Sequence, residues 1–205
     1  VEKLSFGAAA TIQQLLAFSR KGIVTMLPIS IASFLKETIK LQQIAVPESI
    51  SLNSDIHDTE MQINGDINQL QQVLINLINN ASDALSGQKD PVITISLNRY
   101  EADDKFIKQH ETLKGLSFAC ITITDNGTGI EPQLVEHIFE PFFTTKEQGK
   151  GTGLGLAMSY GSIKSHGGCI TVTTKKGGAD SGTSMHIFLP LLAETHDIPA
   201  SVAKL

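Results

Sequence analysis

Hydrophobic residues recur at helical spacing in several stretches of the chain, and the most regular stretch runs from Asp66 to Leu85. Its apolar positions form a wide stripe along one side of a helix, and Asp66 is a candidate N-cap. Apolar residues at positions 31, 34, 35 and 39 predict a second amphipathic helix between Pro28 and Pro47. Further helices are expected at residues 11–20, ahead of a linker, and at residues 132–139 and 154–166.

Alternating apolar and polar positions predict the strands. Short alternating segments at residues 50–52 and 61–63 are separated by turn-forming residues, which indicates a hairpin. Longer strands are expected at residues 92–97, 118–124, 169–174 and 185–189. The stretch at residues 98–115 is too hydrophilic for a core and is expected to be a surface hairpin excursion. Together these elements favour an α+β fold, a two-layer α/β sandwich in which helices cover one face of a mixed, mainly antiparallel sheet.

Composition narrows the function classes. The 205 residues are 41% apolar and 18% charged with a net charge of −5, which is typical of a globular domain with one hydrophobic core. The sequence has no basic run, so nucleic acid is not an expected partner. No apolar stretch approaches the roughly 20 residues that span a bilayer, so we expect no membrane contact by these residues. Cys120 and Cys169 lie in apolar, strand-like runs, which is typical of buried thiols in a reducing compartment such as the cytoplasm.

Asn76, Asn80 and Asp83 form a polar stripe on the helix expected at residues 66–85. Their helical spacing places them on one side of the helix, away from its apolar stripe. Amide and carboxylate oxygens are ligands that Mg²⁺ accepts beside phosphate oxygens. A solvated helix face explains the same spacing, so both interpretations stay open.

The segment ITITDNGTGI, residues 121–130, reads as a strand followed by a carboxylate and a Gly-x-Gly turn. Asp125 could accept a hydrogen bond from an exocyclic amine such as that of adenine. Gly127 and Gly129 would let the backbone approach a ring closely. A plain Asp-Asn-Gly turn is the alternative.

Glycines at positions 149, 151, 153 and 155 lead into the helix expected at residues 154–166. Backbone amides at such a helix start can cradle phosphates, although the glycine spacing is neither that of a P-loop nor that of a Rossmann motif. Just upstream, three aromatic residues and two lysines flank the glycines: Phe139, Phe142, Phe143, Lys146 and Lys150. Aromatic anchors beside a glycine-rich segment indicate a mobile lid whose lysine meets phosphate charge. A flexible connection is the alternative for the glycines, and a small satellite core cluster is the alternative for the aromatic residues.

In this order the motifs resemble those of the histidine kinase branch of the ATPase superfamily that also contains DNA gyrase, Hsp90 and MutL. QQVLINLINNASDAL resembles the N box of that family, DNGTGI the first glycine box, FEPFFTTK the F box, GTGLGL the second glycine box and Gly182-Thr183 the third. The resemblance covers residues 11–190. It implies the Bergerat ATP-binding fold, ATP and Mg²⁺ as ligands, and transfer of the γ-phosphate to a histidine.

The resemblance also implies roles for single residues. Asn80 would bind Mg²⁺, with Asn76 and Asp83 supporting the ion or its waters. Asp125 would recognise the adenine amine, with Thr183 beside it. Asn76, Asn80 and Lys146 would be the catalytic set. The other residues implied in nucleotide binding come from the glycine boxes and the lid: Gly127, Gly129, Ile130, Phe139, Phe143, Thr144, Lys146, Lys150, Gly151, Thr152, Gly153, Leu154, Gly155 and Leu156.

Asn76 departs from the gyrase, Hsp90 and MutL pattern, in which a glutamate usually activates water at this place. An amide cannot act as a general base, so efficient ATP hydrolysis is not expected. None of the six histidines lies in the phospho-accepting motif of the family: His57 lies between expected strands and His110 in the polar excursion. We therefore expect the accepting histidine outside residues 1–205, and no autophosphorylation by these residues alone.

The resemblance divides the chain into three parts. Residues 1–27 would be the end of the second helix of a dimerisation and phosphotransfer hairpin with its linker, residues 28–191 the catalytic domain, and residues 192–205 a C-terminal linker. The implied partners are that upstream domain, a response regulator and a second copy of the parent protein, which could itself be membrane-anchored. Competing hypotheses are a superfamily ATPase that drives a clamp, a protein-serine kinase, and a scaffold module that binds no nucleotide.

Overall fold

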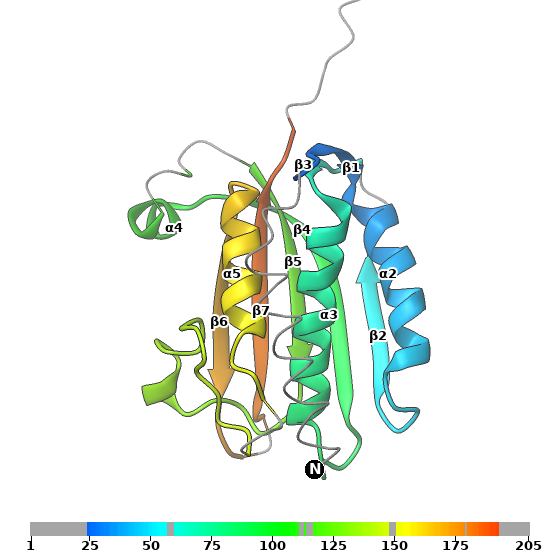
Figure 1. Ribbon diagram of the computed structural model, residues 1–205, viewed down its shortest axis with the longest axis vertical. Helices are drawn as coiled ribbons and strands as arrows, with labels where there is room; N and C mark the ends of the chain where they lie inside the picture. Colours follow the sequence, from blue (N-terminus) through cyan, green and yellow to red (C-terminus); the bar gives the residue numbers. More distant parts are fainter. Residues whose placement is uncertain are drawn as a thin grey trace, which may run out of the picture.

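The computed structural model describes residues 24–56, 60–110, 113, 117–147, 151–178 and 180–192. Five strands form one mixed sheet in the order β2-β4-β5-β7-β6 (Figure 1). β2 and β4 run parallel, and the other neighbouring pairs are antiparallel. The bounds are β2 Ser51–Ile56, β4 Val92–Glu101, β5 Ser117–Asp125, β6 Cys169–Lys175 and β7 Gly182–Pro190. A small antiparallel sheet joins β1 (Leu27–Ser30) to β3 (Gln62–Gly65).

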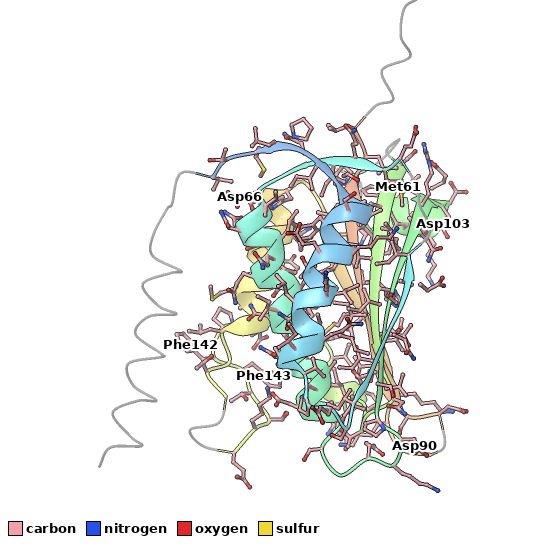
Figure 2. The ribbon with its side chains drawn as sticks, turned by 90° about the vertical axis from the view of Figure 1, so that its right-hand side faces the viewer. Met61, Asp66, Asp90, Asp103, Phe142 and Phe143 are labelled. Carbon is pink, nitrogen blue, oxygen red and sulfur yellow. The ribbon has the colours of Figure 1, made fainter. Side chains whose placement is uncertain are left out.

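Three helices cover one face of the large sheet: α2 (Ile31–Ala45), α3 (Ile67–Ala84) and α5 (Gly155–Ser165). Figure 2 views the sheet along its edge and shows these helices on one side of it. Asp66 starts α3 as predicted, because its side chain accepts hydrogen bonds from the backbone amides of Asn68 and Gln69. Inward-facing aliphatic residues of the strands pack against α3 and are almost fully buried, and each such burial stabilises the fold by about 1.5–3 kcal/mol. The two-layer sandwich expected from the sequence is confirmed.

The other face of the sheet carries a second, aromatic cluster. Side chains alternate along β5, so Phe118 points away from the face that receives Ala119 and the three helices. There it packs with Phe188 and with Phe106 of a short helix, α4 (Asp104–Gln109). The expectation of a plain surface excursion at residues 98–115 was therefore wrong, because two apolar residues within it, Phe106 and Leu113, are buried.

Three further expectations need correction. The segments at residues 50–52 and 61–63 do not form a hairpin, since β2 pairs with β4 and β3 pairs with β1. The helix expected at residues 132–139 is only a 3-10 turn at Pro132–Leu134. Strand β1 was not expected. The helix expected at residues 11–20, the tail after residue 192, His57 and Lys150 lie outside the described residues.

The two cysteines fit the expectation of thiols in apolar surroundings: Cys169 is buried, Cys120 is half-buried, and both are free. Burial raises the pKa of both thiols, that of Cys169 to about 11. Within the described ranges, no helix has the length and apolar character needed to cross a membrane.

Candidate functional site

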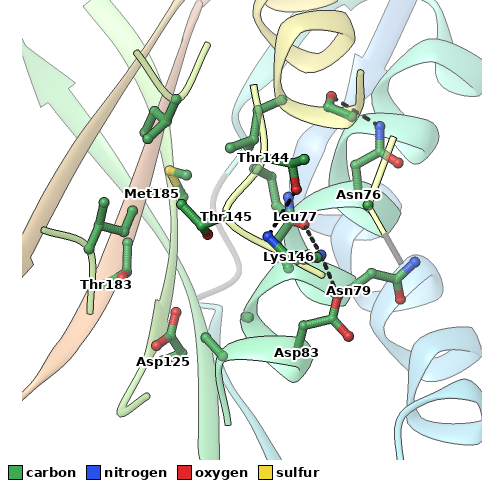
Figure 3. Close-up of a pocket in the computed structure, with 18 of the residues that line it drawn as sticks. Asn76, Leu77, Asn79, Asp83, Asp125, Thr144, Thr145, Lys146, Thr183 and Met185 are labelled. Atoms are coloured by element: carbon green, nitrogen blue, oxygen red, sulfur yellow. Dashed lines mark hydrogen bonds and ion pairs between the residues drawn. The ribbon is translucent and has the colours of Figure 1, made fainter. Parts of the chain in front are cut away.

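A cavity of about 560 Å³ opens between α3, the facing ends of β5 and β7, and the segment before α5 (Figure 3). The structure brings together there most of the residues that the sequence singled out, although they come from segments far apart in the chain. Those lining the cavity are Asn76, Asn80, Asp83, Asp125, Gly129, Ile130, Phe143, Thr144, Lys146, Gly151, Thr152, Gly153, Gly155, Leu156 and Thr183.

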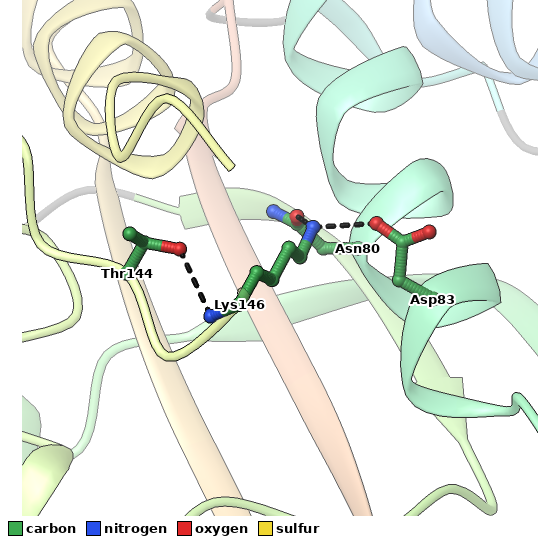
Figure 4. Close-up of polar contacts among 4 residues, drawn as sticks. All are labelled: Asn80, Asp83, Thr144 and Lys146. Atoms are coloured by element: carbon green, nitrogen blue, oxygen red, sulfur yellow. Dashed lines mark hydrogen bonds and ion pairs between the residues drawn. The ribbon is translucent and has the colours of Figure 1, made fainter. Parts of the chain in front are cut away.

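Lys146 reaches across the cavity from the lid segment to α3 (Figure 4). Its Nζ lies 2.5 Å from Asp83 Oδ2 and 3.1 Å from Asn80 Oδ1. Asn80 and Asp83 are one helical turn apart, so both oxygens face the same point in space. This part of the polar stripe therefore holds the Lys146 ammonium in this structure.

Asn76 faces the start of α5, one turn before Asn80. Its Nδ2 donates to the carbonyl oxygen of Gly155 at 3.4 Å, and its Oδ1 accepts a hydrogen bond from Gln72 Nε2 at 3.1 Å. Both ends of the amide are thus held by the protein, and Asn76 joins the N box to the second glycine box.

Asp125 ends β5, and Figure 3 shows it with Thr183 on the side of the pocket away from Asn76. Only 6% of its surface is exposed, and its Oδ1 accepts a hydrogen bond from the backbone amide of Gly127 at 2.9 Å. Burial raises the pKa of this carboxyl group, while the amides of Gly127 and Thr183 act in the opposite direction. Thr183 is its direct partner on β7, which confirms the expected proximity of the two residues.

Two glycines of the site are required by their surroundings. Gly129 has φ +69°, and a Cβ atom there would lie 2.2 Å from the carbonyl oxygen of Lys175. Gly153 has φ +66°, and a Cβ atom there would lie 2.3 Å from the carbonyl carbon of Phe142. Because the Phe142 amide donates to the Gly153 carbonyl oxygen at 2.9 Å, this glycine lets the lid lie against the second glycine box.

Some expected residues do not line the cavity. Gly127 contacts the Asp125 carboxylate through its backbone amide, and a Cβ atom there would lie 2.6 Å from the carbonyl oxygen of Ala84. Phe139 packs against the core and lies 5.5 Å from the ring of Tyr160. Leu154 is buried, with 3% of its surface exposed. Phe143 does anchor the lid on the core as expected, whereas Phe142 is 64% exposed.

Sequence reasoning missed the apolar wall of the cavity. Ile123 and Met185 are paired on β5 and β7, two residues from Asp125 and Thr183 on the same face. Strand alternation could have identified both. The other lining residues that were missed are Leu77, Asn79, Ala81, Ala84, Thr128, Leu134, Ile138 and Thr145.

Comparison with known proteins agrees with this geometry. Residues 65–193 match the model of the family described as histidine kinase-, DNA gyrase B- and HSP90-like ATPases. The chain belongs to this family. Sensor kinase CckA of Brucella abortus is 39% identical to it over 189 residues, which cover 91% of this chain but 19% of that protein. The chain therefore spans about a fifth of the length of this relative.

Solved structures of histidine kinases share the fold. The mycobacterial sensor histidine kinase MprB superposes with a TM-score of 0.63 at 25% identity, over 81% of this chain and 97% of that chain. Histidine kinase ThkA, solved in complex with the response regulator TrrA, has a TM-score of 0.67 at 20% identity, over 95% of this chain and 50% of that chain. The Bergerat-type sandwich is thus shared with histidine kinase catalytic domains, and the family is an ATP-binding one.

Proposed function

We propose that this chain binds Mg²⁺-ATP and presents its γ-phosphate to a histidine outside residues 1–205, as the catalytic domain of a two-component sensor histidine kinase. The observation that carries the proposal is one cavity with hydrogen-bond acceptors on β5 and β7 and, on α3, oxygens that contact the Lys146 ammonium. Asp125 and Thr183 provide the first, and Asn80 and Asp83 the second. Family membership and the sensor-kinase relatives support the same function.

The donor set suits a divalent cation, because Asn80 Oδ1 and Asp83 Oδ2 are oxygens of the kind that hard cations take and both are near enough to contact one group, the Lys146 ammonium. Among the described residues there is no group of three or more His, Cys, Asp or Glu side chains that could hold a metal ion. A site with an amide and a carboxylate suits Mg²⁺, which takes its remaining ligands from phosphates and water. When bound, the ion would neutralise charge on the phosphates. Asn80 would be its direct ligand and Asp83 would support it.

The chain's own residues would mainly position the nucleotide. Asp125 accepts a hydrogen bond from the base amine. The backbone amides of the segment before α5 and of its first residues, from Gly151 to Leu156, would surround the phosphates, where the helix dipole favours negative charge. Lys146, which contacts Asn80 and Asp83 in this structure, would meet the γ-phosphate if released from them.

The site favours transfer of the γ-phosphate over hydrolysis of ATP, because neither of its carboxylates is available as a general base. Within the described part of the chain, only Asp83 and Asp125 provide carboxylates to the cavity wall. Asp83 pairs with Lys146 in this structure and would support the cation in the loaded site, so it is engaged in both cases. Asp125 lies at the base end of the cavity. Asn76 cannot take a proton from water. The site thus lacks the general base that a clamp ATPase needs.

The accepting histidine is proposed to lie in another part of the parent protein. The four described histidines, His110, His137, His166 and His186, do not line the cavity. A helical dimerisation domain ahead of residue 28, a second copy of the parent and a response regulator would complete the system. ThkA supports the last of these, since its structure was solved with a response regulator.

The test uses the full-length parent protein with γ-labelled ATP. We expect label that is labile in acid and stable in base, as phosphohistidine is, and none on residues 1–205 alone. Acid-stable phosphoserine would support the serine-kinase alternative and contradict the proposal. Steady-state hydrolysis by residues 1–205 that disappears in Asn76→Ala would support the clamp ATPase. An absence of Mg²⁺-ATP binding would support the scaffold.

A further inference from the structure

We propose that Thr174, at the end of β6, is a positioning residue that sets the preference of the site for a base with an exocyclic amine. Its hydroxyl joins the first glycine box to the third and turns the oxygen of Thr183 toward the cavity as a hydrogen-bond acceptor. The inference rests on the proposed nucleotide site. Thr174 itself does not line the cavity, so it acts through its neighbours.

Three polar groups converge on the Thr174 hydroxyl. The backbone amide of Ile130, in the first glycine box, donates to Thr174 Oγ1 at 2.9 Å. Thr174 Oγ1 donates to the carbonyl oxygen of Gly182, in the third glycine box, at 2.9 Å. Thr183 Oγ1 lies 3.3 Å from Thr174 Oγ1. One side chain therefore contacts both glycine boxes that flank the base pocket.

The direction of these hydrogen bonds follows from counting hydrogens. A hydroxyl group has one hydrogen and two lone pairs, an amide N–H can only donate, and a carbonyl oxygen can only accept. The single hydrogen of Thr174 is therefore committed to Gly182. Thr183 must then donate its own hydrogen to Thr174, which leaves the lone pairs of Thr183 Oγ1 for a ligand.

The consequence is a pair of acceptors on neighbouring strands. Thr183 is 7% exposed and lines the cavity beside Asp125, whose ionised carboxylate can only accept. An exocyclic amine offers hydrogens to such a pair. A carbonyl oxygen at the same place on the base offers none and faces two acceptors, so the pocket discriminates against it.

Contacts beside Thr174 hold the same loop independently of its hydroxyl. Gly129 lies so close to Lys175 that a Cβ atom would be 2.2 Å from the Lys175 carbonyl oxygen. Lys176 Nζ forms an ion pair with Glu131 Oε1 at 2.8 Å. Loss of the Thr174 hydroxyl should therefore leave the loop near its place and mainly change the orientation of the Thr183 hydroxyl.

The experiment measures the Kd of Mg²⁺-ATP and of Mg²⁺-ITP, whose base carries a carbonyl in place of the amine, by calorimetry. In Thr174→Val, which keeps the side-chain shape without the hydroxyl, the preference for ATP should fall by about fivefold. Thr174→Ser should restore it. Thr171→Val is the matched control, because Thr171 lies on the same strand but is paired with His186 and not with Thr183. It should leave both constants unchanged.

An equal loss of affinity for both nucleotides in Thr174→Val would show a merely structural role and overturn the inference. An unchanged ratio of the Kd of Mg²⁺-ITP to the Kd of Mg²⁺-ATP would overturn it too. Wild-type chain that does not bind ATP at all would instead contradict the proposed function. If the valine variant does not fold, Thr174→Ala is judged by the same ratio. In a Thr183→Val background, adding Thr174→Val should not change the ratio further, because Thr174 acts through Thr183.

Discussion

Under the proposed function, we expect recognition of the base to depend most on Asp125. In Asp125→Asn, one acceptor oxygen is replaced by an NH₂ group that faces the base amine with its own hydrogens. Hydrogen bonds to charged groups contribute about 1.5–3 kcal/mol, so the Kd of ATP should rise by about 10- to 100-fold in calorimetry. Asp180→Asn is the control, because Asp180 is exposed and pairs with Lys175 outside the cavity. Equal affinity in Asp125→Asn and wild type would refute this role.

His186 makes stability depend on pH. Its ring nitrogens lie 3.1 Å from Thr122 Oγ1 and 3.0 Å from Thr173 Oγ1, and burial lowers its pKa below the ordinary 6.5. The unfolded chain then binds the proton more tightly, so the stabilisation from neutral His186 is present above about pH 6.5 and is lost as the pH falls through the lower folded-state pKa. Between about pH 7.5 and about pH 5, His186→Asn should lose about 2 °C less in Tm than wild type.

The control for this pH effect is His137→Gln. Glu140 raises the pKa of His137, so protonation of His137 favours the folded state and its removal should not reduce the loss of Tm in acid. If His186→Asn loses as much Tm in acid as the wild type does, groups other than His186 cause the loss.

At the scale of elements, the lid is held to α3 by a weak contact. The Lys146–Asp83 pair is partly exposed, with side-chain exposures of 35% and 58%, and such pairs contribute less than about 1 kcal/mol. Lys146→Met should therefore increase protease cleavage between residues 144 and 153 by up to about fivefold without nucleotide, and should weaken ATP binding. Lys175→Met is the matched control, since its ion pair with Asp180 lies outside the lid. Unchanged cleavage would contradict the tether.

The elements also show where sequence patterns are sufficient and where they are not. Helical period fixed the face of α3, so the positions of Asn80 and Asp83 relative to the core were predictable. Alternation predicted β2 and β3 but not their partners, because it specifies which face of a strand is buried and not which strand lies beside it. The mean polarity of residues 98–115 gave no sign of α4, because Phe106 is the one described side chain of this short helix that is buried in the aromatic cluster.

At the scale of the whole molecule, the site exists only because the sheet order brings distant segments together. β5 and β7 are neighbours although residues 126–181 separate them along the chain, and this pairing places Thr183 opposite Asp125. Local spacing cannot predict such a pair, and here only the resemblance to a known family did so. The contacts of the Thr174 hydroxyl could not be predicted for the same reason, since its partners lie 44 and 8 residues away along the chain.

Binding of Mg²⁺-ATP should stabilise the entire fold, because the cavity is built from α3, β5, β7 and the lid together. A ligand at about 100 times its Kd adds about 2.7 kcal/mol to the free energy of unfolding. In a domain of this size that corresponds to an increase in Tm of about 5–10 °C in a thermal shift assay. With ATP and a chelator in place of Mg²⁺, the increase should be smaller, because the phosphates then lack the cation that Asn80 is proposed to bind. Asn80→Ala should make the two increases equal, while the control Asn98→Ala on β4 should behave as wild type. An equal increase in wild type with and without Mg²⁺ would contradict the cation role of Asn80, even if ATP binding itself is confirmed.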